Sequence, residues 1–95
     1  MTEEGNQRIH AIVEGLVQGV GFRYSVIEIS NRLHLTGWVR NTVNGHVEVV
    51  AEGPRTNLEN LISFLKIGPR SAQVNDVKIE WLTTTGEFNN FNVHF

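Results

Sequence analysis

A glycine-rich loop followed by an arginine is the strongest chemical signal in this sequence. Gly15-Leu16-Val17-Gln18-Gly19-Val20-Gly21-Phe22 holds three glycines within its first seven residues, and Arg23 comes next. Glycines let successive backbone N–H groups point into one concavity, which is a common way to bind an anion. Arg23 adds a planar cation that can contact two phosphate oxygens at once. A simpler interpretation stays open, namely a tight strand-to-helix turn with an exposed arginine.

Asn41 is the second candidate, because it follows Trp38-Val39-Arg40 at the end of a predicted strand and precedes a predicted turn. A neutral amide both donates and accepts hydrogen bonds, so it can orient a water beside a bound phosphate. Taken alone, an ordinary turn asparagine is the more common explanation. The residue types therefore indicate a phosphate site only if the fold brings Arg23 and Asn41 together.

Other side chains that could do chemistry are not arranged for it. The four histidines are His10, His34, His46 and His94. They are scattered, without a pair at helical spacing or a neighbouring carboxylate cluster, so we expect no metal site. Ser25 has no evident histidine partner, which disfavours a serine hydrolase. Glu48 and Glu52 share one strand face, where we expect a solvated surface rather than a catalytic carboxylate pair.

The residue pattern predicts a strand, a helix and a β-hairpin around the candidate site. Residues 8–14 alternate apolar and polar side chains like a half-buried strand, which the glycine loop interrupts. From Phe22 the apolar residues recur at helical spacing. A second strand is predicted over 36–40 and a third over 46–52, joined by Asn44-Gly45, which strongly favours a tight hairpin turn.

The rest of the chain predicts a second helix and further strands. An apolar helical stripe ends at Gly68-Pro69 and consists of Leu58, Leu61, Ile62 and Leu65. A fourth strand is predicted over about 74–82, and residues 91–95 could add a short last one. We expect residues 1–7 to be a disordered N-terminal tail and residues 8–95 to be a single domain.

The predicted order is strand, helix, strand, strand, helix, strand, which is the split βαβ or ferredoxin-like arrangement. We therefore predict an α+β sandwich, with an antiparallel sheet and both helices on one face. A helix joins the first two strands, so they run parallel, and the third strand can insert between them. The glycine loop, the start of the first helix and the end of the second strand then gather at one edge. This brings Arg23 and Asn41 close, although such a fold does not by itself give a function.

Composition narrows the classes of protein. The net charge is −2 at pH 7, with both signs interspersed, which argues against a broad nucleic-acid-binding face. The strands also lack the interleaved basic and aromatic residues of an RNA-binding platform. There is no cysteine, which excludes disulfides, thiolate nucleophiles and zinc–sulfur sites. Because no apolar run could span a membrane and the N-terminus is unlike a secretory leader, we expect a soluble, cytoplasmic protein.

Two blocks of the sequence resemble the acylphosphatase family. Gly15-Leu16-Val17-Gln18-Gly19-Val20-Gly21-Phe22-Arg23 is similar to the family signature G-x-V-Q-G-V-x-F-R. Residues 37–48, from Gly37-Trp38-Val39-Arg40-Asn41 onward, resemble its second block, G-x-V-x-N-x-x-D/N-G-x-V-E. The match extends in order and with family spacing from Arg8 to Phe95. Arg70 replaces a common second proline and Asn44 a commoner aspartate, and neither departure touches the proposed site.

The resemblance implies an acid-anhydride hydrolase that converts acyl phosphates to a carboxylate and inorganic phosphate. Arg23 and Asn41 are its implied catalytic residues: Arg23 binds the phosphoryl oxygens and stabilises their charge, and Asn41 holds the attacking water in line. The implied phosphate-binding residues are Gln18, Gly19, Val20, Gly21, Phe22 and Arg23. A carboxylate leaving group needs no general acid, and in this family the substrate phosphate is thought to take the water's proton. No metal, cofactor, nucleic acid or membrane is implied, and a small chain of mixed charge is expected to be a monomer.

Two other functions stay open. A non-catalytic module of the same fold could bind a phosphate or carboxylate in the same cradle, and an assay would separate it from a hydrolase. The chain could also be a domain of a larger protein that handles carbamoyl phosphate, although Met1 and the terminal strand argue mildly against this. No motif residue is left over to identify the physiological acyl group.

Overall fold

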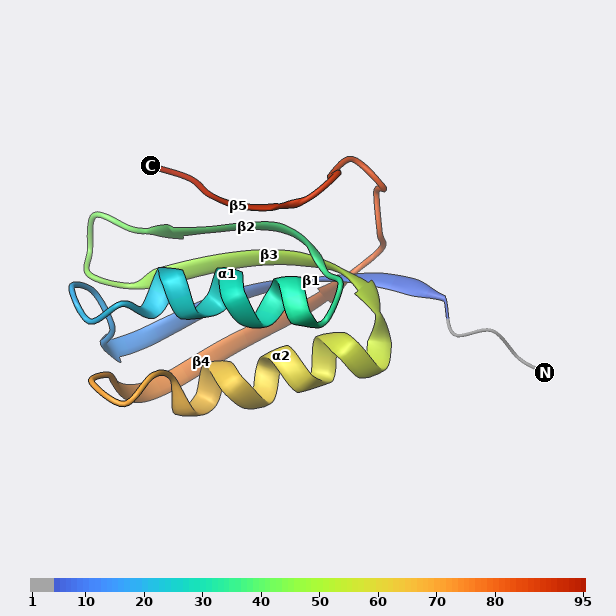
Figure 1. Cartoon of the computed structure of the whole chain (residues 1–95). Coiled ribbons are helices and arrows are strands. Elements are labelled where there is room, and N and C mark those ends of the chain that lie inside the picture. Colours follow the sequence, from blue (N-terminus) through green and yellow to red (C-terminus); the bar gives the residue numbers. More distant parts are fainter. Residues whose placement is uncertain (1–4) are drawn as a thin grey trace.

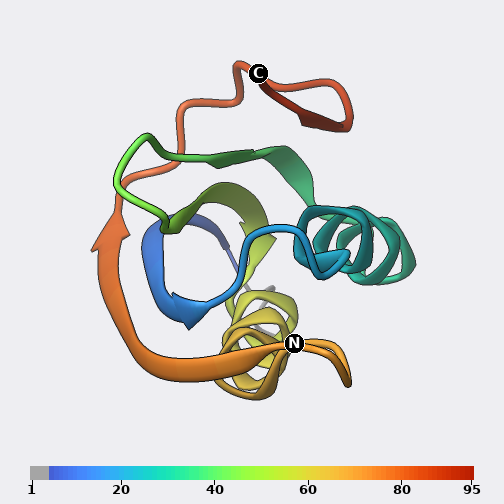
Figure 2. The same ribbon diagram turned by 90° about the vertical axis from the view of Figure 1, so that its left-hand side faces the viewer.

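The computed structural model describes residues 5–95 and shows the predicted order of strands and helices (Figure 1). The elements are β1 (Asn6–Leu16), α1 (Phe22–Arg32), β2 (Thr36–Asn41), β3 (Val47–Pro54), α2 (Arg55–Ile67), β4 (Gln73–Leu82) and β5 (Phe91–Val93). Both helices cover the same face of one five-stranded sheet, which is seen in both ribbon views (Figures 1 and 2). The predicted α+β, ferredoxin-like fold is confirmed.

The strand order in the sheet is β4-β1-β3-β2-β5. As expected, β3 lies between β1 and β2 and is antiparallel to both. The four main strands form the expected antiparallel sheet, and the short last strand β5 makes it a mixed sheet by pairing parallel with β2. The physical reason is the path of the chain after β4. Residues 83–90 cross the end of the sheet where β2 begins, so β5 enters from that end and runs beside β2 in the same direction (Figure 1).

The core lies between the helices and the sheet, where the predicted alternation places the apolar side chains. Fully buried members from the strands are Ile9, Ala11, Val13, Val39, Val47, Val49 and Ala51. From the helices they are Phe22, Val26, Leu58, Leu61 and Leu65. In a strand successive side chains point to opposite faces, so these odd-numbered positions all reach the helices. Among the described residues, neither helix is long and apolar enough to cross a bilayer.

The first strand begins earlier than the sequence indicates. Asn6 and Gln7 already pair with Pro54 and Gly53 on β3, because β3 continues to Pro54 and offers its backbone as a partner. Because both side chains are polar, the alternation of apolar and polar residues does not indicate that the strand extends to these two positions. Of the expected disordered tail over 1–7, residues 1–4 lie outside the described residues.

The expectation of a solvated Glu48 and Glu52 is wrong for Glu52, whose side chain is only 4% exposed. The 83–90 connection folds over it, so that Thr84, Thr85 and Gly86 donate hydrogen bonds to its carboxylate at 2.9–3.0 Å. Arg8 forms an ion pair with the same carboxylate at 3.1 Å. Burial raises the pKa of Glu52, but the hydrogen bonds outweigh burial and lower it to about 2.

Glu48 also has partners that the sequence did not indicate. Its carboxylate lies 2.6 Å from His10 Nε2 and 2.6 Å from Arg40 Nε, so His10 does have a carboxylate neighbour. Burial raises the pKa of Glu48, and the hydrogen bonds and charges of these two residues lower it overall. Across residues 5–95, no three His, Cys, Asp or Glu side chains gather as a metal-binding group.

Candidate active site

The loop between β1 and α1 owes its shape to glycines. Gly19 and Gly21 adopt φ of 75° and 78°, the left-handed region that other residues rarely enter. Gly21 immediately precedes the first helical residue, and its carbonyl accepts the first helical bond, from Ser25 N–H at 3.1 Å. The chain therefore turns sharply from the strand into the helix, and the space beside Gly19 and Gly21 is open, since a Cβ added at either would meet nothing within 4 Å.

The backbone donors of this loop are free. Within residues 5–95 the structure shows no hydrogen bond donated by the backbone N–H groups of 18–22, and no side chain caps α1. The first turn of α1 has no acidic residue to balance the positive end of the helix dipole, and it carries Arg23 instead. Free donors, a positive dipole end and a cation together form a typical anion-binding arrangement.

Gln18 ties this loop to the β2–β3 hairpin. Its Nε2 donates to the carbonyl oxygens of Thr42 and His46 at 2.7 and 2.8 Å. The two carbonyl groups that accept these bonds lie on either side of the hairpin turn, so Gln18 holds the loop and the end of β2 together. The side chain of Gln18 therefore faces the hairpin.

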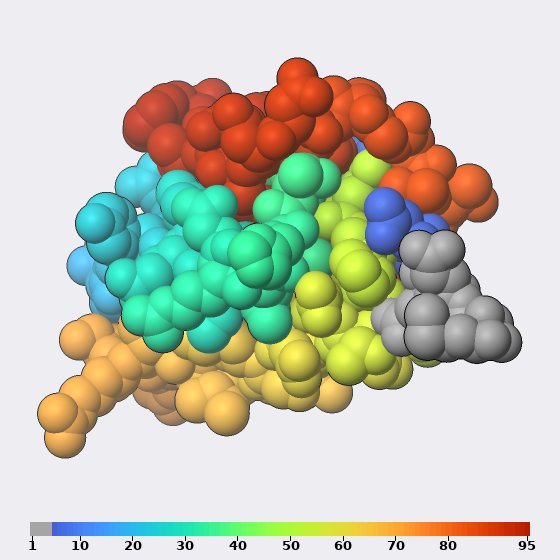
Figure 3. Space-filling view, turned by 45° about the vertical axis from the view of Figure 1, so that its right-hand side comes forward, coloured from blue at the N-terminus to red at the C-terminus, as the bar shows by residue number. Residues whose placement is uncertain are grey.

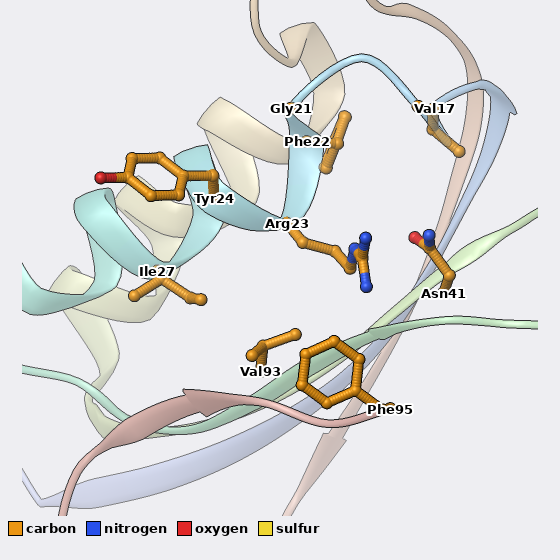
Figure 4. Close-up of a pocket in the computed structure, with 10 residues that line it drawn as sticks. Val17, Gly21, Phe22, Arg23, Tyr24, Ile27, Asn41, Val93 and Phe95 are labelled. Carbon is orange, nitrogen blue, oxygen red and sulfur yellow. The ribbon is translucent and has the colours of Figure 1, made fainter.

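Arg23 and Asn41 line one pocket of about 250 Å³. Figure 4 shows the guanidinium of Arg23 and the amide of Asn41 pointing toward one another across it. Of the predicted phosphate-binding residues, four line the pocket and two do not. The four are Gly19, Gly21, Phe22 and Arg23, and the two are Gln18 and Val20.

Asn41 is the last residue of β2, where it pairs with Val47 of β3. Its Oδ1 is buried and has no hydrogen-bond partner in the described part of the chain. A buried polar atom without a partner is destabilising by about 1–3 kcal/mol, and such exceptions in native proteins call for an explanation. A small turn of the side chain toward the pocket would expose this oxygen to a water, which would supply the missing donor.

The pocket has further lining residues that the sequence did not single out: Val17, Tyr24, Ile27, Val93 and Phe95. The Cζ atom of Arg23 lies 5.9 Å from the centre of the Phe95 ring. No local signal could have found this pair, because they come from α1 and from the end of the chain after β5. Only the parallel placement of β5 beside β2 brings them together.

Comparison with known proteins identifies the arrangement. The family model for acylphosphatase matches residues 9–93, which is almost the whole chain. This chain belongs to the acylphosphatase family. It is 44% identical to the acylphosphatase of Pyrobaculum islandicum over 89 residues, covering 93% of this chain and 94% of the relative. It is 49% identical to the acylphosphatase of Trichormus variabilis over 74 residues, covering 78% and 73% of the two chains.

Solved acylphosphatases have a closely similar backbone fold. The enzyme of Coxiella burnetii matches with a TM-score of 0.90 at 40% identity, over 99% of this chain and all of that one. The Bacillus subtilis acylphosphatase matches with a TM-score of 0.90 at 34% identity, over 94% and 99%. A likeness to full-length HypF, at 23% identity and over 12% of that chain, shows the fold alone.

Proposed function

We propose that this chain hydrolyses acyl phosphates to a carboxylate and inorganic phosphate, in the pocket lined by Arg23 and Asn41. The observation that best supports this proposal is that three features meet in the pocket: the cation of Arg23, the loop with free backbone N–H donors, and the unpaired amide oxygen of Asn41. Membership of the acylphosphatase family supports the reaction and does not favour a non-catalytic binding module.

In this mechanism Arg23 and the amides of residues 18–22 bind the phosphoryl group. The guanidinium contacts two oxygens in its fork, and the free N–H groups and the helix dipole face the others. These donors are already in place, so little reorganisation is needed as charge spreads over the oxygens in the transition state. Gln18 contributes by fixing the loop to the hairpin through its two side-chain bonds.

Asn41 orients the attacking water. Its Oδ1 accepts one O–H, which aims the water oxygen at phosphorus, opposite the bond to the acyl oxygen. The new P–O bond forms as that bond breaks, and the bonding electrons leave with the carboxylate. The water's proton passes to a phosphate oxygen. A carboxylate is a weak base, so its departure needs no general acid, and no His, Asp or Glu is among the residues that line the pocket.

The direct test is hydrolysis of benzoyl phosphate, with EDTA present, by the wild type, Arg23→Ala and Asn41→Ala. We expect Arg23→Ala to lose both turnover and inhibition by inorganic phosphate. Asn41→Ala should keep phosphate inhibition and lose roughly 10²-fold or more in kcat, the scale of one transition-state donor or orienting amide. Rate and inhibition constant are both measured by steady-state kinetics.

Two variants serve as matched controls. Arg32→Ala and Asn60→Ala remove the same kinds of side chain from exposed positions on α1 and α2 that do not line the pocket. Both should retain wild-type kinetics. Wild-type rates in Arg23→Ala or Asn41→Ala would contradict the role assigned to that residue. Saturable phosphate binding without any wild-type hydrolysis would favour the binding module instead.

We further propose that residues 8–95 act as a single domain in a cytoplasmic monomer. Small size and interspersed charges support a monomer of one domain, and a sequence without cysteine fits a reducing cytoplasm. Light scattering on the eluting peak of a sizing column should give the mass of one chain, and a dimer mass would contradict it.

A further inference from the structure

The pocket has an apolar side that the hydrolysis of a phosphate alone does not use. Ile27 on α1, Val93 on β5 and Phe95 just after it line this side, and we call these three residues the apolar wall. In Figure 4 the three lie below and beside Arg23, whereas Tyr24 extends its ring away from the guanidinium. In the space-filling view, the residues around β5 form a ridge that lies directly against α1 (Figure 3).

The backbone of the segment that carries Val93 and Phe95 is anchored to β2, Ile27 and Val93 are half-buried, and Phe95 is exposed. His94 N–H donates to the carbonyl of Val39 at 2.8 Å, and its ring stacks on Trp38 with 5.0 Å between centroids. Because successive residues of an extended segment point to opposite faces, this anchors Val93 and Phe95 toward the helices. Yet the side chain of Phe95 is fully exposed. Apolar side chains that line a pocket beside a few polar groups are typical of a ligand-binding site.

The direction of the reaction points to the apolar wall. In-line displacement places the leaving oxygen opposite the attacking water. If Asn41 holds the water and Arg23 holds the phosphoryl group, the leaving group extends from phosphorus away from Asn41. Figure 4 shows Arg23 lying between Asn41 on one side and Ile27 and Val93 on the other. The acyl group would therefore extend over Ile27 and Val93, with the Phe95 ring beside the guanidinium at the near end of this path.

We propose that Ile27, Val93 and Phe95 bind the acyl group, so that this chain favours acyl phosphates with an aromatic or bulky apolar acyl group. Short or charged acyl groups leave the wall exposed to water and gain nothing from it. This inference rests on the proposed function, since it takes the positions of phosphate and water from that mechanism. It assigns Phe95 as a specificity-determining residue.

The test compares kcat/KM for benzoyl phosphate and acetyl phosphate, which share the reacting group and differ in apolar surface. Phe95→Ala should reduce the benzoyl-to-acetyl ratio about five- to tenfold, near the lower end of discrimination by a hydrophobic pocket. Phe95 is exposed, so its truncation should not unfold the protein. Phe95→Leu keeps an apolar side chain and should retain most of the ratio.

Ile67→Ala is the control, because it truncates an exposed apolar residue of α2 that does not line the pocket. Its ratio should equal that of the wild type. If Phe95→Ala slowed both substrates equally, Phe95 would act only by positioning Arg23, and the inference would be wrong. An unchanged ratio would also overturn it. A wild type that hydrolyses neither substrate would instead refute the proposed function on which the inference rests.

Discussion

Gly15 and Gly21 both have positive φ, but the chain needs glycine there for different reasons. At Gly15, where the β1–β4 register shifts, an added Cβ would come within 2.1 Å of the carbonyl oxygen of Gln73. At Gly21 the added Cβ would meet nothing within 4 Å, so only the left-handed backbone restricts the residue. Gly15 thus serves the packing of two strands, and Gly21 serves the shape of the anion loop.

We therefore expect alanine at the two positions to act differently. Gly15→Ala should lower the free energy of unfolding by roughly 2–4 kcal/mol, because backbone strain and a steric clash add together. Gly21→Ala should lower it by only about 1 kcal/mol, yet weaken inhibition by inorganic phosphate severalfold as the loop amides shift. Urea denaturation and inhibition kinetics measure both. Equal loss of stability in the two variants would contradict this distinction.

At the scale of elements, the connection from β4 to β5 positions two of the residues that line the pocket. It crosses the end of the sheet far from the glycine loop, and Glu52 holds it there through Thr84, Thr85 and Gly86. From that anchor the chain returns along β2 as β5, which brings Val93 and Phe95 to the pocket. A buried carboxylate at one end of the molecule therefore supports the apolar wall at the other.

The pH dependence of stability tests this anchor. The pKa of Glu52 is lowered from 4.5 to about 2 in the folded chain, so its ionised form favours folding. That contribution, about 3 kcal/mol, is present above pH 4.5 and is lost as the pH falls from 4.5 toward 2.

Removing the charge isolates the effect of Glu52 from that of other carboxylates. Glu52→Gln should be less stable than the wild type at pH 7, and the difference should shrink as the pH approaches 2. Glu80→Gln, at an exposed position of β4, should follow the wild-type curve. Urea denaturation at a series of pH values gives the free energy of unfolding of each protein. A difference between the wild type and Glu52→Gln that stayed constant with pH would rule out the ionisation of Glu52 as its cause.

For the whole molecule, the order of strands in the sheet determines where the candidate active site lies. Because β3 separates the parallel strands β1 and β2, the loop after β1 and the last residue of β2 reach the same end of the sheet. Gln18 then bonds the two together. Occupying this site should therefore stabilise the complete fold, because the unfolded chain cannot assemble it.

Inorganic phosphate should raise the melting temperature of this protein through such linkage. At ten times its dissociation constant, phosphate adds about 1.4 kcal/mol, which corresponds to roughly 6–11 °C for a domain of this size. Scanning calorimetry should show this rise in the wild type and in Asn41→Ala, and none in Arg23→Ala. A control with sodium chloride at equal ionic strength separates binding from general salt effects. An equal rise in all three chains would place the phosphate elsewhere.

Much of this protein can be predicted from its sequence alone, because the deciding signals are local. Alternating side chains, helical stripes and the Asn44-Gly45 turn predict the elements, and their order predicts that β3 inserts between β1 and β2. The glycine loop and Arg23 indicate an anion site, and two motif blocks indicate the family. These features depend on neighbouring residues, whose geometry is largely set by backbone sterics and side-chain periodicity.

What only the tertiary structure decided involves residues that meet across the fold. The burial of Glu52, the parallel pairing of β5 and the place of Phe95 beside Arg23 all depend on the path of residues 83–90. The unpaired Oδ1 of Asn41 likewise emerges only once the strands and helices have packed around it. Periodicity reports which face of an element a side chain occupies, but what covers that face is set by chain segments remote in sequence.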